Sequence, residues 1–106
     1  ALDAWAQAWS RRDVDAYFAA YAPGFAGRKG HASREAWMAE RRERILSRQS
    51  ISVTVSAVEA RRLDGQIEAV FEQRYRSDGP ADLSRKRVRL APVDGRWLIT
   101  QEADLP

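Results

Sequence analysis

Three Asp-Gly pairs divide the second half of the chain into segments with the character of β-strands. The pairs stand at 64–65, 78–79 and 94–95, each near the end of an alternating or β-rich run. Asp-Gly favours tight hairpin turns, because both residues tolerate positive φ angles. The pattern predicts four antiparallel strands joined in sequence order, at residues 51–63, 66–77, 84–93 and 96–103. Strands longer than the usual ~5–6 residues twist and curl, so the sheet should be curved.

The first half of the chain has the periodicity of helices. Apolar residues recur at helical spacing in residues 2–10, 13–22 and 33–47. Asp13 and Ser33 should cap the second and third helices, and the second should end at Pro23-Gly24. The inner stripe predicted for the third helix contains Trp37, Met38, Arg41, Ile45 and Leu46. Helices followed by strands indicate an α+β fold, with three N-terminal helices packed on a curved four-stranded antiparallel sheet.

Length and composition fit one globular domain over residues 1–106, with 44% hydrophobic and 31% charged residues. Because the sequence starts almost inside a helix and without Met, we expect a domain excised from a longer protein. It contains no cysteine, which excludes disulfides and thiolate chemistry. No apolar run approaches the ~20 residues that span a bilayer. The net charge is +3 and arginine greatly outnumbers lysine, a skew more typical of coding bias than of nucleic-acid binding.

Two polar residues interrupt predicted apolar faces. Gln73 shares one face of its strand with Phe71 and Tyr75, and Arg41 lies in the middle of the inner stripe of the third helix. A buried amide without a partner costs a few kcal/mol, roughly, so either the core holds a polar network or the strand lines a pocket. We expect Gln73 and Arg41 to bond each other, Tyr75, Glu102 or water.

A larger set of aromatic and polar side chains could meet at the open end of the curved sheet. The candidate ligand-binding residues are Tyr17, Tyr21, Trp37, Arg41, Gln73, Tyr75, Lys86 and Glu102. They would suit a small amphipathic or anionic ligand, with aromatic walls, an arginine for a carboxylate and an amide to orient it. A purely structural polar network would give the same sequence, so both interpretations stay open.

Several motifs carry a family resemblance. They are W-x3-W at 5–9, DVDAYFAAYAPGF at 13–25, R-E-A-W-x3-R-x3-I at 34–45, AVFEQRYRS at 69–77 and R-W-L-I-x2-E at 96–102. The chain resembles the nuclear transport factor 2-like (NTF2-like) superfamily, which includes ketosteroid isomerases and SnoaL-type cyclases. More narrowly, it resembles the C-terminal accessory domain of bacterial L,D-transpeptidase-like proteins.

This resemblance implies a cone-shaped fold and a noncatalytic accessory module of a bacterial cell-envelope protein. The module would bind a partner protein, a cell-wall fragment or a small amphipathic ligand in the cone. Its implied location is the periplasm or cell envelope, with the cytoplasm as the alternative.

The alternative function is a small enzyme of ketosteroid isomerase or SnoaL type acting on a hydrophobic carbonyl compound. Glu102 is the one carboxylate that can be placed near the pocket, and regular alternation puts it on the face of Thr100, opposite Ile99. The single histidine, His31, lies in a Gly-rich loop, GRKGH at 27–31, which lacks the spacing of a phosphate loop. No residue pair has metal-ligand spacing. We therefore expect no catalytic residue, no cofactor and no metal site.

A homodimer through the convex face of the sheet is an expected interaction, because members of this superfamily commonly pair there. The residues predicted on that face include Val70, Arg74, Arg85, Arg87 and Arg89. A face so rich in arginine favours a polar or weak dimer, since stable homodimer interfaces are apolar at their centre. A neighbouring domain of the parent chain and a cell-wall component are the other expected partners, and no nucleic acid is expected.

Overall fold

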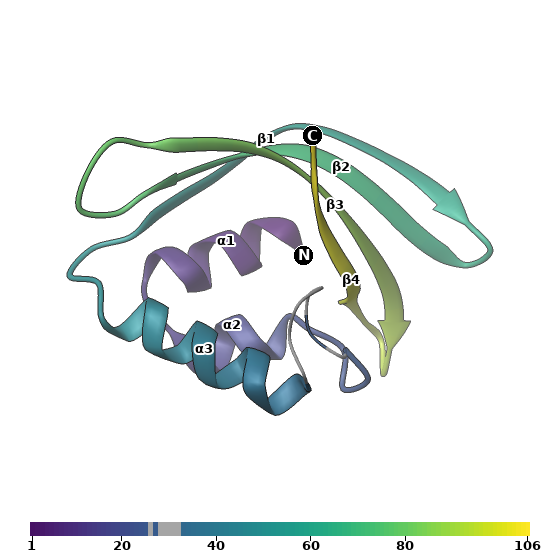
Figure 1. Ribbon diagram of the computed structural model, residues 1–106. Helices are drawn as coiled ribbons and strands as arrows, with labels where there is room; N and C mark the ends of the chain where they lie inside the picture. Colours follow the sequence, from purple (N-terminus) through teal and green to yellow (C-terminus); the bar gives the residue numbers. More distant parts are fainter. Residues whose placement is uncertain (26, 28–32) are drawn as a thin grey trace.

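The computed structural model describes residues 1–25, 27 and 33–106. Its elements are α1 (Leu2–Ser10), α2 (Val14–Ala19), α3 (Arg34–Leu46), β1 (Ser52–Leu63), β2 (Gln66–Arg76), β3 (Asp82–Val93) and β4 (Arg96–Leu105). The strands form one antiparallel sheet in the order β1-β2-β3-β4. The sheet arches over the three helices (Figure 1), which confirms the predicted α+β class. Most of the GRKGH loop, including His31, lies outside the described residues.

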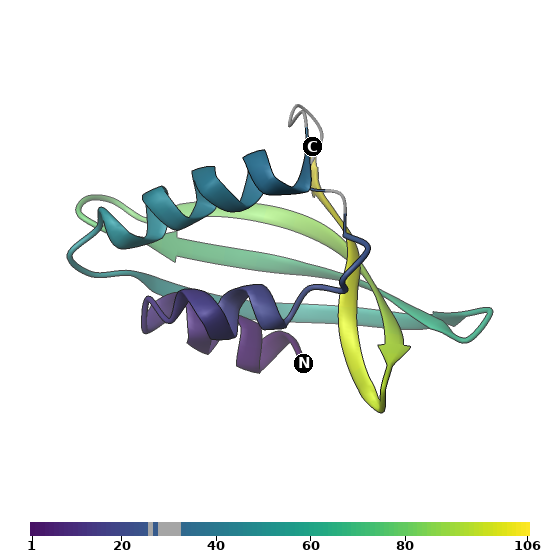
Figure 2. The ribbon, with the colours of Figure 1, turned by 90° about the horizontal axis from the view of Figure 1, so that it is seen from below.

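The helices occupy the concave side of the sheet in two groups. In Figure 1, α1 lies close beneath the sheet, and α3 lies further from it. Seen from below (Figure 2), α1 and α2 follow the β1 side, whereas α3 runs along the β3 side. The candidate site lies between α3 and the sheet.

Two of the three Asp-Gly pairs form tight hairpin turns. Asp64 and Gly65 have φ angles of 49° and 79°, and Asp94 and Gly95 have 50° and 80°. Positive φ at both central residues is the geometry of a type I′ turn, whose twist matches that of the flanking strands. The pair at 78–79 instead lies in a longer connection between β2 and β3, so β3 begins two residues earlier than predicted.

The second helix is shorter than predicted. Asp13 and Ser33 cap α2 and α3 as expected, but α2 ends at Ala19 and not at Pro23-Gly24. The reason is that the next residues pair with the edge of β4: the Ala22 N–H donates to the Ile99 carbonyl, and the Ile99 N–H donates to the Ala20 carbonyl, both at 2.8 Å. This short parallel bridge withdraws the chain from the helix and directs Tyr21 into the core.

Both edge strands contain an irregularity. In β1 the register shifts between Ser56 and Glu59, where Ala57 has a φ angle of 52°. In β4, Ile99 pairs with Leu90 and Gln101 pairs with Arg89, so Thr100 is an extra residue, a β-bulge.

The bulge in β4 overturns the prediction that Glu102 and Ile99 lie on opposite faces, although Glu102 is buried as expected of a pocket candidate. Regular alternation would place Glu102 opposite Ile99, but the extra residue restores both to the inner face. Ile99 is 1% exposed, and the Glu102 side chain is 2% exposed. Glu102 can therefore take part in the interior of the cone.

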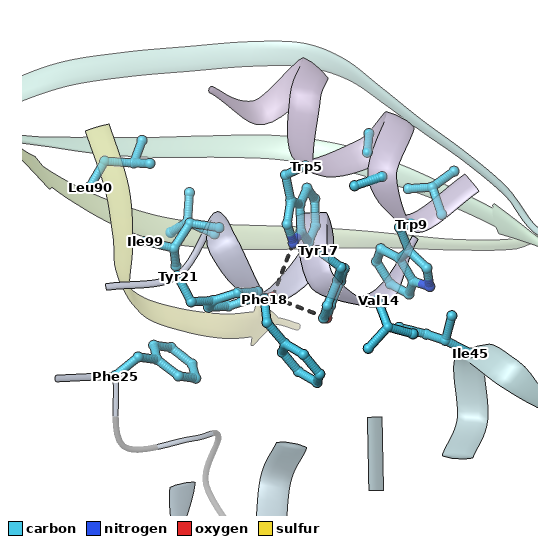
Figure 3. Packing of buried hydrophobic residues seen from close by; sticks show 14 of the residues in the cluster. Trp5, Trp9, Val14, Tyr17, Phe18, Tyr21, Phe25, Ile45, Leu90 and Ile99 are labelled. Atoms are coloured by element: carbon cyan, nitrogen blue, oxygen red, sulfur yellow. Dashed lines mark hydrogen bonds between the residues drawn. The ribbon is translucent and has the colours of Figure 1, made fainter. Parts of the chain in front are cut away.

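Aromatic rings dominate the core between the helices and the sheet (Figure 3). Trp5, Tyr17 and Trp37 are at most 1% exposed, and the ring centres of Tyr21 and Trp37 lie 4.7 Å apart. Such contacts favour a specific arrangement of rings in addition to burying apolar area. The inner stripe of α3 is confirmed except at Leu46, which is 49% exposed because it lies at the end of the helix, beyond the aromatic cluster.

Candidate ligand-binding cleft

A cleft of about 370 Å³ opens between α3 and strands β2, β3 and β4. Its inner lining comes from Trp9, Arg41, Ile45, Gln73, Tyr75 and Lys86. Charged and polar residues complete it: Arg44, Arg48, Asp82, Ser84 and Asp104. Four of the eight predicted site residues thus line one cleft. The other four, Tyr17, Tyr21, Trp37 and Glu102, are not part of its wall.

Arg41 is a buried cation without a carboxylate partner. The residue is 8% exposed, and its guanidinium carbon lies 5.1 Å from the centre of the Trp9 ring and 5.9 Å from that of Tyr17. Among the residues that the structure describes, no carboxylate lies within ion-pair distance of Arg41, and its Nε has no hydrogen-bond partner. Stacking on aromatic faces compensates only part of the cost of burying a charge.

The protonation of Arg41 and Tyr17 is coupled. Burial raises the pKa of Tyr17, and the positive charge of Arg41 opposes that rise. Burial lowers the pKa of Arg41, but its interactions with Tyr17, Tyr21 and Glu102 together outweigh this and leave its pKa above the ordinary value. Arg41 therefore stays charged, and Tyr17 stays a neutral phenol, at physiological pH.

Gln73 supplies an unpaired acceptor to the same cleft. The strand register confirms its predicted position, because Gln73 pairs with Val55 on one side and Ser84 on the other and is 5% exposed. None of the expected side-chain partners reaches it, since Oε1 has no hydrogen bond within the described part of the chain. Native structures leave few buried polar atoms unpaired, and those few call for an explanation such as a ligand.

A chain of hydrogen bonds lies deeper, at the closed side of the cleft. The indole N–H of Trp5 donates to the Tyr21 hydroxyl at 3.0 Å, and that hydroxyl donates to Oε1 of Glu102 at 2.6 Å. Nζ of Lys86 donates to Oε2 of Glu102, also at 2.6 Å. Tyr17 joins the chain through a 3.1 Å contact between its hydroxyl and that of Tyr21.

These hydrogen bonds fix the position of Lys86. The side chains of Lys86 and Glu102 are 4% and 2% exposed, so their ion pair is almost fully buried. The ammonium group also lies 5.7 Å from the Trp5 ring centre and 5.5 Å from that of Trp9. Burial, with the neighbouring Tyr17 and Glu102, raises the pKa of Tyr21 well above 10.0. The predicted polar residues therefore divide between a buried hydrogen-bond network and the wall of a cleft.

Trp37 was predicted to line the ligand site, but it lies in the core. It is 0% exposed, and its ring packs 4.7 Å from Phe25 and 5.5 Å from Phe18. It therefore belongs to the core behind the cleft and not to the cleft wall.

Several lining residues were missed in the sequence. Arg44 follows Arg41 by three residues, a helical spacing that places both on one face of α3, and this signal was available. Arg48 lies beyond the end of α3, where helical spacing no longer applies. Asp104 faces inward only because of the bulge at Thr100, which the sequence does not mark.

The convex face carries the predicted row of arginines. Arg85, Arg87 and Arg89 alternate with the buried Lys86, Val88 and Leu90. Acidic residues from β2 lie among them, and Glu68 forms ion pairs with Arg61 at 3.0 Å and with Arg89 at 3.5 Å.

Within residues 1–25, 27 and 33–106, no group of three His, Cys, Asp or Glu side chains could hold a metal ion. In the same described part, no helix is long and apolar enough to cross a membrane.

A curved antiparallel sheet wrapped around three helices, with a cleft on its concave side, defines an NTF2-like α+β domain. The chain belongs to the family described as the Cds6 C-terminal NTF2-like domain, whose model matches residues 1–103. No curated protein matches the sequence.

Solved structures support the same fold. Bd1075 of Bdellovibrio bacteriovorus superposes with a TM-score of 0.86 at 25% identity, over 99% of this chain and 37% of its own. The helical cell shape determining protein Pgp2 of Campylobacter jejuni (K307A mutant) gives 0.83 at 15% identity, over 96% of this chain and 37% of its own. An NTF2-like protein of Pseudomonas putida KT2440 gives 0.77 at 16% identity, over 95% and 78%. The chain thus spans little more than a third of the first two proteins.

Proposed function

We propose that this domain is a noncatalytic accessory module of a bacterial cell-envelope protein and that its cleft binds an anionic fragment of the cell wall. The family and the fold similarity to Pgp2, a protein that determines cell shape, support an envelope role. In this proposal the parent protein is exported to the periplasm and carries an enzyme of the L,D-transpeptidase type. The domain would hold the wall near that enzyme.

The observation that carries the proposal is the state of Arg41. A guanidinium that is nine-tenths buried, charged and without a carboxylate partner in the described structure lies in the wall of a cleft. An incoming anion would supply the missing charge in a site where water screens the interaction little. A purely structural arginine would be expected to have an internal carboxylate.

The isomerase-like alternative has weaker support. Its base would have to be a carboxylate free to accept a proton from a substrate in an apolar pocket. Glu102 instead accepts hydrogen bonds from Lys86 and Tyr21 and does not line the cleft. Using it as a base would require breaking a buried ion pair.

Co-sedimentation with purified peptidoglycan sacculi tests the proposal. The domain should pellet with sacculi, and Arg41→Met should reduce the pelleted fraction several-fold, because the substitution removes the charge but keeps a long side chain. Arg62→Met, at an exposed position of β1 outside the cleft wall, is the matched control and should pellet like the parent. A domain that stays in the supernatant, or an Arg41→Met variant that pellets equally, contradicts the proposal.

A further inference from the structure

We infer that the cleft recognises the C-terminal end of a peptide: a carboxylate whose adjacent carbon bears an amide N–H. The inference rests on the proposed function and specifies the chemical group that is bound. It follows from two unpaired polar groups, a donor on α3 and an acceptor on β2, that border one cleft.

Arg41 defines the anionic part of the ligand. The three other cations that line the cleft each have a carboxylate nearby: Lys86 is paired with Glu102, Arg48 lies 3.9 Å from Asp78, and Arg44 lies 3.8 Å from Glu40. Within the described part of the chain, Arg41 has no carboxylate at ion-pair distance, and its Nε–H has no hydrogen-bond partner. A planar guanidinium with several N–H donors matches the two oxygens of a carboxylate.

Gln73 defines the second part of the ligand. Its unpaired Oε1 needs a hydrogen-bond donor, which an ionised carboxylate lacks. A neutral sugar has hydroxyl donors for Gln73 but no charge for Arg41, and a fully ionised phosphate has charge but no donor. The terminal residue of a peptide carries both, because its N–H is attached to the carbon that bears the carboxylate.

The remaining wall suits a small apolar side chain next to these groups. Trp9, Ile45 and Tyr75 contribute apolar surface, and the ring centres of Trp9 and Tyr75 lie 5.4 Å apart. The cleft volume of about 370 Å³ falls at the lower end of the range of small-ligand sites, roughly 300–1,000 Å³. It therefore fits a terminal dipeptide better than a long chain.

Calorimetric titration with three probes tests the inference. N-acetyl-alanyl-alanine carries the proposed group. In its C-terminal amide, an uncharged carboxamide replaces the carboxylate. N-acetylglucosamine has hydroxyl and amide groups but no carboxylate. We expect the free acid to bind, the amide to bind about tenfold more weakly or worse, and the sugar not to compete. Equal binding of the acid and the amide, or binding of the sugar alone, would overturn the inference.

Variants at Gln73 separate recognition from folding. Gln73→Met keeps the length of the side chain but removes the acceptor, so affinity for N-acetyl-alanyl-alanine should fall about tenfold. Its thermal midpoint should stay the same or rise, because an unpaired buried acceptor is lost. Gln101→Met, the same change on the outer face of β4, should affect neither quantity. Unchanged affinity in Gln73→Met would refute the role of the acceptor.

Sacculi whose carboxylates have been converted to amides distinguish this inference from the proposed function. We expect binding to untreated sacculi, loss of binding to amidated ones, and displacement by N-acetyl-alanyl-alanine. If amidated sacculi bind equally, the inference fails and the envelope function stands. If neither kind of sacculi binds and the dipeptide does not bind either, both the proposed function and the inference fail. If the dipeptide binds and sacculi do not, the proposed function fails and the inference stands, with a free peptide or the C-terminus of a protein as the ligand.

Discussion

Lys86 and Glu102 form an ion pair that the surrounding rings shield almost completely from water. Removing one partner takes the nearest opposite charge away from the other, which stays buried. We expect Glu102→Gln or Lys86→Met alone to lower the free energy of unfolding by about 3–5 kcal/mol. Urea denaturation of the purified variants measures this.

The double variant Lys86→Met/Glu102→Leu provides the control for that pair. It removes both charges together, so most of the lost stability should return. Additive losses in the double variant would show that the two side chains act independently.

Ionisation of the Tyr21 phenol makes the free energy of unfolding depend on pH in the alkaline range. Its pKa is raised well above 10.0, so between 10.0 and the folded-state pKa the unfolded chain releases this proton while the folded chain retains it. Stability from this source is present below pH 10.0 and falls as the pH rises above it.

Urea denaturation across this pH range checks the effect. In Tyr21→Phe the free energy of unfolding should fall less steeply above pH 10.0. The reason is that phenylalanine has no hydroxyl to titrate in either the folded or the unfolded state. Tyr75→Phe, which removes a hydroxyl outside the Glu102 hydrogen-bond chain, is the control for the chemical change. A Tyr21→Phe variant with the same slope as the parent would contradict the assignment.

At the level of elements, the cap of α3 holds the helix that presents Arg41. The Ser33 hydroxyl accepts a hydrogen bond from the Ala36 N–H at 3.0 Å. Ser33→Ala should lower the free energy of unfolding by about 1 kcal/mol, because an N–H at the helix start loses its partner. Thermal and urea denaturation would show this, with Ser47→Ala, at the other end of α3, as a control expected to cost less. Equal losses at both ends would argue against capping.

Helices and hairpin turns could be predicted from the sequence because their signals are local. Asp13 and Ser33 lie next to the helices they cap, and both Asp-Gly hairpins follow from adjacent residues. The early end of α2 could not be predicted, since it depends on pairing with Ile99, which is about eighty residues away in the sequence. The bulge at Thr100 has no sequence mark either, and it decides which way Glu102 and Asp104 point.

For the candidate site, it was easier to predict which polar residues are buried than which side chains they contact. Periodicity placed Arg41 and Gln73 inside, and both are buried. Which side chains meet them depends on the distance between α3 and the sheet, a property of the whole fold. Trp37 and Lys86 had similar sequence support, but one belongs to the core and the other to the cleft.

For the molecule as a whole, we propose that the convex face mediates weak self-association. Arg87 lies near the middle of this face, and Glu68 and Glu72 on β2 could meet arginines of a second copy. Light scattering during size-exclusion chromatography should show dimers at low salt and high protein concentration. Higher salt should favour the monomer, as expected for exposed charges. Arg87→Met should weaken the dimer, and a monomer under every condition would contradict this proposal.

The irregularities in the two edge strands have a consequence for the behaviour of the free domain. An unpaired, regular edge is a template on which another chain can add a strand and begin to aggregate. Here Ala57 interrupts β1, Thr100 interrupts β4, and residues 20–22 cover part of the β4 edge. Neither edge offers an unbroken row of backbone groups. The same extra residue that turns Glu102 inward thus also helps to protect the sheet from uncontrolled growth into fibres.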